Sequence, residues 1–182
     1  MKVKELLMLC AEMGNLNLDV NTFENDAKVV GACARQLLNC CNFVLEELYR
    51  DYASAVKRTV VEVADGFVDT SSLNLCKVIS LVDGEGNDVK YRYAEGGLSV
   101  NGSGKFNLCY ARLPSALGLK DDIALPSPRI TERVLAYGIL REYFTIIGDT
   151  YTASQWEERY HGALRIADVK NSTMRMPARR WL

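Results

Sequence analysis

The chain has 182 residues, of which 48% are apolar and 25% are charged, and its formal net charge is −1. This length and composition suit one sizeable hydrophobic core with room for a small subdomain. A net charge so close to zero excludes a global field that attracts nucleic acid or an anionic membrane. We expect no membrane span and no signal peptide, because the chain has no run of about 18 apolar residues and Glu5 and Glu12 interrupt the N-terminal apolar stretch.

Two amphipathic helices are expected at the start of the chain. Val3, Leu6, Leu7 and Cys10 have the spacing i, i+3, i+4 and i+7, and Gly14 is expected to end this helix. A second helix of about 30 residues, roughly 45 Å long, is predicted from apolar residues that step by three and four. These residues are Phe23, Ala27, Val30, Ala34, Leu37, Cys41, Val44 and Leu48.

From Arg58 the apolar period changes from 3.6 to 2, which indicates β-strands. Expected strands cover residues 59–63, 76–82, 89–93, 98–100 and 106–110, and glycine-rich turns separate them. Short strands with turns every 8–12 residues or so predict an antiparallel meander that forms a small sandwich or barrel. The pattern leaves open which of the two forms.

Two more helices are predicted after residue 127. Pro128 is expected at the first helical position, and the apolar face of this helix comprises Ile130, Val134, Leu135, Leu140, Tyr143, Phe144 and Ile147. Gly148 can adopt a left-handed cap, and Thr152 to Gln155 resembles a capping box for the last helix. The buried face expected for that helix comprises Ala153, Trp156, Tyr160, Ala163, Leu164 and Ala167.

The last residues differ in character, with four cations and no acidic side chain from Lys170 onward. Such a segment cannot form its own core, yet it contains large apolar side chains. We interpret it as a docking arm for a protein partner, since tryptophan and arginine are common in interface hot spots. A nucleic-acid contact and simple disorder are the alternatives. The candidate docking residues are Met174, Arg175, Met176, Arg179, Arg180, Trp181 and Leu182.

No residue pattern indicates catalysis, a cofactor or a metal site. The single histidine, His161, has no nucleophile or second ligand at a recognisable spacing, and a surface or interface role is favoured. The six cysteines mostly occupy apolar positions and contain no CxxC motif, which favours reduced, core-filling thiols. The segment 83–88 lacks the spacing of an EF-hand, and a tight hairpin explains it.

The expected fold is therefore α+β. A helical bundle, formed by the long N-terminal helix and the C-terminal helix pair, would contain an inserted small antiparallel β-sandwich or barrel. An extended C-terminal tail would follow. The expected boundaries are 1–55 with 114–171 for the helical domain, 56–113 for the β-subdomain and 172–182 for the docking arm.

This order of parts resembles the head–tail connector proteins of tailed bacteriophages, which are also called adaptor or head-completion proteins. The resemblance covers most of the chain and lies in the order of its segments. They are Lys77-Val78-Ile79-Ser80-Leu81-Val82-Asp83-Gly84, Tyr110-Ala111-Arg112-Leu113-Pro114, Asp121-Asp122, Leu135-Ala136-Tyr137-Gly138 and Ala153-Ser154-Gln155-Trp156-Glu157-Glu158-Arg159-Tyr160.

The resemblance implies a non-enzymatic virion protein, made in the host cytoplasm and located in the neck. Copies of it would form a homo-oligomeric ring, dodecameric by resemblance, beneath the portal protein. The ring would extend the DNA channel, so that DNA passes without sequence recognition, and would bind the next neck or tail protein. Residues 174–182 would dock on the portal or on a neighbouring subunit.

Two other functions remain open from the sequence, and an enzyme of unrecognised type ranks well behind both because it would need a pocket with perturbed titratable groups. One is a tail-terminator or tail-completion ring protein, which usually has a β-rich core. The other is a nucleic-acid-binding module that uses the β-subdomain and the Arg/Trp tail, with salt-dependent affinity.

Overall fold

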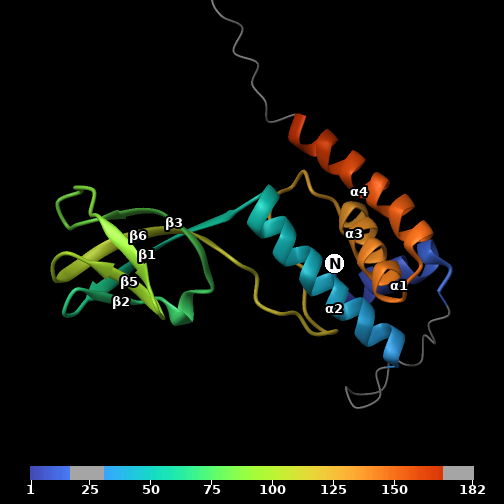
Figure 1. Ribbon diagram of the computed structural model, residues 1–182, viewed down its shortest axis with the longest axis horizontal. Helices are drawn as coiled ribbons and strands as arrows, with labels where there is room; N and C mark the ends of the chain where they lie inside the picture. Colours follow the sequence, from blue (N-terminus) through green and yellow to red (C-terminus); the bar gives the residue numbers. More distant parts are fainter. Residues whose placement is uncertain (17–30, 170–182) are drawn as a thin grey trace, which may run out of the picture. The chain divides into compact units, whose positions relative to one another are not determined.

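The computed structural model describes residues 1–16 and 31–169 (Figure 1). Within them the chain is a mixed helix and sheet protein, with four α-helices and two three-stranded antiparallel sheets. It divides into two compact units. The helical unit falls within Met1–Val44 and Leu117–Leu182, and the β unit is Leu45–Ala116. The expected docking arm, 172–182, lies outside the described residues.

Helix α1, Val3–Gly14, forms as its apolar spacing predicts. Val3, Leu6, Leu7 and Cys10 are fully buried, and the Glu5 carboxylate accepts a hydrogen bond from the Lys2 backbone N–H at 3.0 Å. The helix ends at Gly14, as expected. The residue in the left-handed conformation is the next one, Asn15, with φ 50°. Asparagine adopts this conformation more readily than most residues because its short polar side chain can hydrogen-bond locally.

The predicted 30-residue helix is also wrong. Helix α2 begins at Ala32 and ends at Glu47, and Gly31 before it is not helical. Glycine weakens a helix by about 1 kcal/mol relative to alanine, which favours a helix start on its C-terminal side. The remaining expected positions before it, such as Phe23, lie outside the described residues. Leu48–Tyr52 then form a π-helical turn, and β1 follows at Ala55.

Helices α3, Glu132–Ile146, and α4, Thr150–Val169, form the predicted hairpin, but their starts differ from the prediction. Pro128 lies in a turn before α3, and Thr131 is the extended N-cap residue. The capping box at Thr152 is wrong, because Asp149 caps α4 and its carboxylate accepts a hydrogen bond from the Thr152 N–H at 3.1 Å. Gly148 is left-handed as predicted, with φ 83°.

The predicted buried faces of α3 and α4 are largely confirmed. Ala153, Trp156, Tyr160 and Leu164 are buried, as are six of the seven positions expected on the first helix of the pair. The exceptions are Ile147, which is 49% exposed and follows the end of α3, and Ala163 and Ala167 on α4, which are only partly buried.

Helices α2, α3 and α4 meet at Gly138 on α3. A Cβ atom at this position would lie 2.6 Å from Val44 Cγ1 on α2 and 2.9 Å from Tyr160 Cε2 on α4. Figure 1 shows α2 and α4 running in the same direction, with α3 running back between them. The side chain of Asn42 on α2 fixes the return loop, since it exchanges hydrogen bonds of 2.7 and 3.2 Å with the backbone N–H and C=O of Leu117.

The β unit contains strands β1 (Ala55–Val63), β2 (Phe67–Asp69), β3 (Leu75–Val82), β4 (Tyr91–Ala94), β5 (Gly97–Val100) and β6 (Gly104–Arg112). The strand orders are β1-β6-β3 and β2-β5-β4, with antiparallel pairing in both. The expected meander is therefore wrong, and the described strands form two sheets rather than a closed barrel. Alternation locates a strand and its buried face, but it does not select the neighbouring strand.

Side chains from both sheets form one hydrophobic cluster in the β unit. Strand β6 pairs along its whole length with β1, from Arg112 opposite Ala55 to Gly104 opposite Val63. This pairing directs one side of each strand into the shared core. The fully or nearly buried members are Val63, Val68, Val78, Leu81, Leu98, Val100, Phe106, Leu108 and Tyr110.

Candidate interaction surfaces

The seven candidate docking residues of the sequence analysis, from Met174 to Leu182, lie outside the described residues. The surfaces below belong to the described part of the chain, and each lies within one unit.

Buried thiols of the helical unit serve packing rather than chemistry. Cys10, Cys40 and Cys41 are fully buried. Burial raises the pKa of Cys40 and of Cys41 to about 12, and the nearby Glu142 carboxylate adds to the shift at Cys40. The reactive form of cysteine is the thiolate, so these side chains are inert near neutral pH.

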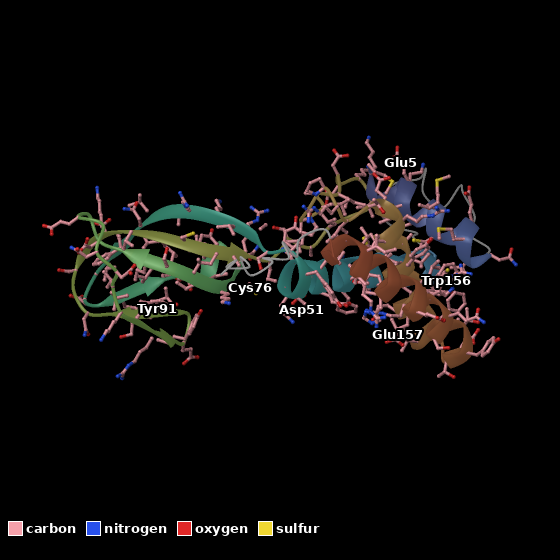
Figure 2. All side chains as sticks on the ribbon, turned by 90° about the horizontal axis from the view of Figure 1, so that it is seen from above. Glu5, Asp51, Cys76, Tyr91, Trp156 and Glu157 are labelled. Atoms are coloured by element: carbon pink, nitrogen blue, oxygen red, sulfur yellow. The ribbon has the colours of Figure 1, made fainter. Side chains whose placement is uncertain are left out.

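His161 lies at the edge of α4, with its side chain 40% exposed. Its Nε2 atom is 3.7 Å from the Glu157 carboxylate one turn earlier, and its ring lies beside that of Tyr160. Figure 2 shows Glu157 and the buried Trp156 as successive labelled residues of α4. Across the described residues, no three His, Cys, Asp or Glu side chains are placed to hold a metal ion.

The segment 83–88 is a self-contained hairpin turn. The Asp83 carboxylate accepts hydrogen bonds from the backbone N–H groups of Glu85 and Asn87, both at 2.9 Å. These bonds, led by those from Asn87, lower the pKa of Asp83. The Asp83 carboxylate thus stabilises the turn through hydrogen bonds within the segment, which agrees with the hairpin interpretation.

Large apolar side chains are exposed around the turn between α3 and α4. Ile146 at the end of α3 and the next residue, Ile147, are about half exposed, and Tyr151 in the first turn of α4 is 74% exposed. The Asp149 cap and the left-handed Gly148 set the backbone conformation of this tight connection, which carries the three side chains. Ile166, further along α4, is 67% exposed. An apolar group of this kind is typical of a protein contact surface.

Two tyrosines protect the edge of strand β3. The Tyr93 hydroxyl accepts a hydrogen bond from the Val78 N–H at 3.0 Å, and the Tyr91 hydroxyl donates one to the Val78 C=O at 3.5 Å. Their rings meet edge to face at 5.8 Å, and Tyr91 is labelled in Figure 2. Unpaired edge strands invite pairing with other chains. The two hydroxyls occupy this edge at Val78, whereas the Tyr93 ring stays exposed.

An open hollow of about 740 Å³ lies beside this edge, between β3 and the strands β4 and β5. Lys90, Tyr91 and Arg92 contribute two cations and an aromatic ring to it, and Asp88 contributes an acid. The β unit as a whole has ten acidic and eight basic side chains. A polyanion would therefore meet no net positive charge on this unit.

The outer side of the β1-β6-β3 sheet is also apolar in part. Val56 and Val60 on β1 are each more than half exposed. The register places Ala111 of β6 between the two edge strands, opposite Val56 and Lys77. Exposed apolar residues of this kind are common on protein surfaces, and these two need no partner to explain them.

Searches with known protein-family models and against curated proteins returned no match to this chain. In the described ranges, 1–16 and 31–169, no helix has both the length and the apolar content that a membrane crossing requires.

Hydrophobic periodicity identifies buried faces, so it did not predict these surfaces. Ile147 was expected on a buried face, and neither the exposed Phe43 nor Tyr151 was expected at a surface. A signal was nevertheless present. Phe43 and Ile166 are large apolar residues on the sides of their helices that face solvent, where an amphipathic helix normally has polar residues.

Proposed function

We propose that the chain is a structural protein of a tailed bacteriophage, a head–tail connector that forms a ring beneath the portal. The helical unit, in this proposal a bundle, would form the body of the ring. The β unit, in this proposal a two-sheet sandwich, would meet the next neck or tail protein. Residues 174–182 would form the docking arm on the portal or a neighbouring copy.

The observation that supports this proposal most is the order of the two units along the chain. The β unit, Leu45–Ala116, is inserted between two halves of the helical unit. That is the arrangement implied by the resemblance in the segments quoted above. A shared fold order indicates a function only by analogy, so the surfaces must be considered as well.

The exposed apolar side chains favour a protein that assembles. In the helical unit, Ile146, Ile147, Tyr151 and Ile166 are exposed on rigid helix ends or faces. Burying such side chains contributes about 25 cal/mol per Å² of apolar surface. Copies that repeat one such head-to-tail contact form a ring when the rotation between neighbours closes.

The charge distribution suits a channel through which DNA slides. DNA binds tightly where cations replace its counterions, and such binding would hinder passage. The net charge of −1 and the slight acidic excess of the β unit avoid such binding. A nucleic-acid-binding module remains the second candidate, because Lys90, Tyr91 and Arg92 line one hollow.

The docking arm can be tested by removing it. A variant that lacks residues 172–182 should keep its circular dichroism spectrum and lose binding to purified portal rings. The matched control replaces the same residues by an equally long Gly/Ser segment and should lose binding as well. Portal binding that survives both changes would contradict the proposed arm. Binding to DNA with a steep salt dependence, without binding to the portal, would favour the nucleic-acid module.

A further inference from the structure

The side of α4 that points away from its buried face has an unusual composition. Residues spaced by three or four along it are Tyr151, Gln155, Glu158, Gly162 and Ile166, which we call the α4 outer face. A Cβ atom at Gly162 would meet no atom within 4 Å. A glycine inside a helix costs about 1 kcal/mol relative to alanine. Within the described chain nothing packs closely enough on Gly162 to require it.

The corresponding side of α2 carries a complementary set of residues. Arg35, Asn39 and Phe43 follow one another at intervals of four, and all three are exposed. We call them the α2 outer face. Phe43 is 59% exposed. Apart from Arg35, α2 has no charged residue before Glu46, so this face is positive.

The two outer faces match in spacing and in charge. Arg35 and Phe43 are eight residues apart, as are Glu158 and Ile166, which corresponds to about 12 Å along each helix. Asn39 and Gly162 stand at the two midpoints. Neither Arg35 nor Glu158 forms an ion pair in the part of the chain that the structure describes. The partners of Arg159 and Glu157, by contrast, lie on α4 itself.

The direction of the helices agrees with this match. Helices α2 and α4 run in the same direction on the two sides of α3 (Figure 1). Copies related by a small rotation about an axis keep this direction, so α4 of one copy would meet α2 of the next copy in parallel. In a homodimer with a two-fold axis, by contrast, a face meets itself.

We propose that the α4 outer face of one copy packs on the α2 outer face of the next copy, head to tail. This inference rests on the proposed ring assembly and names its contact. Glu158 pairs with Arg35, Ile166 packs on Phe43, and Gly162 lies opposite Asn39, where the missing side chain lets the two backbones approach. Such close approach is a common use of glycine at helix contacts.

The register also predicts the inclination of the helices in the ring. Val44 and Tyr160 both contact the site of Gly138, so they lie at one level within a copy. The proposed pairs shift neighbouring copies by seven residues along the helices, or about 10 Å. The helices are therefore inclined to the ring axis.

Disulfide trapping tests the contact directly. A double variant with Asn39→Cys and Gly162→Cys should form a ladder of dimers, trimers and longer products under mild oxidation of a concentrated solution. Each single variant alone should stay uncross-linked, and an equimolar mixture of the two single variants should stop at dimers. The wild type controls for its native cysteines. An off-register pair, Asn39→Cys with Gln155→Cys, lies about 10 Å from the proposed contact and should not cross-link.

Two outcomes would overturn the inference. Dimers formed by either single variant alone would show that a face meets itself. A 39/162 double variant that cross-links no more than the off-register control would show that the faces do not meet. Ladders formed by a protein that does not bind the portal would support this contact and contradict the connector function. Portal binding without ladders would support the connector function and contradict this contact.

Discussion

Gly138 offers the sharpest test of the packing in the helical unit. A methyl group at this position would lie 2.6 Å from Val44 Cγ1 and 2.9 Å from Tyr160 Cε2. Both neighbours are fully buried, and the branched valine side chain has few rotamers to which it can move. Overpacking of a core costs about 1–3 kcal/mol, whereas alanine gains about 1 kcal/mol of helix propensity over glycine.

The close contacts place this clash at the upper end of the overpacking cost. After the gain in helix propensity is subtracted, Gly138→Ala should lower the free energy of unfolding of the helical unit by about 1–2 kcal/mol. The matched control is Gly162→Ala, where the new methyl group meets no atom within 4 Å. That variant should have a free energy of unfolding about 0.5–1 kcal/mol higher than the wild type. Urea unfolding of the dilute proteins, followed by circular dichroism, measures both changes.

A second substitution tests the assigned cause. Val44→Ala removes one of the two clashing side chains, so its cost should be smaller in the Gly138→Ala background than in the wild type. The coupling between neighbouring residues is typically about 0.5–3 kcal/mol. If Gly138→Ala stabilises the protein as Gly162→Ala does, or if the two substitutions are additive, the proposed three-helix contact at Gly138 is refuted.

Three further predictions follow from single contacts. Asn42→Ala should lower the free energy of unfolding by about 2 kcal/mol, because two partly buried hydrogen bonds to the return loop are lost. The control Asn39→Ala, at an exposed position, should change urea unfolding little. The free energy of unfolding should fall as the pH rises above about 8.5. The Cys41 thiol of the unfolded chain ionises there, whereas burial raises the pKa of Cys41 in the folded chain to about 12. Cys41→Ala should flatten this pH dependence, and an unchanged slope would contradict the assignment. Tyr93→Phe should speed hydrogen exchange at the Val78 amide, and full retention of its protection would show that the hydroxyl does not hold this edge.

Local patterns predicted much of the secondary structure. The spacing of Val3, Leu6, Leu7 and Cys10 and that of Trp156 and Tyr160 located buried helix faces that the structure confirms. Period-two alternation likewise located β1, β3, β4, β5 and β6 to within a few residues. Patterns of this kind succeed because burial on one face leaves a regular trace in the sequence.

Helix ends and strand partners were harder to predict. Asp149 and Thr152 are both good capping residues, so the sequence pattern alone does not select the first, which the structure shows as the cap. Strand β2, with three residues, is too short for a visible alternation. Pairing of β6 with both β1 and β3 depends on contacts between distant segments, which a local pattern does not contain. The docking arm at residues 174–182 remains a prediction.

The mass of the protein in solution, alone and with purified portal rings, tests the central claim most directly. Light scattering should show a monomer or small oligomer that joins the portal as one complete ring, with a fixed number of copies per portal. A soluble ring that forms without the portal and does not bind it would favour a tail-completion protein. A monomer that ignores the portal at every concentration would contradict the connector proposal.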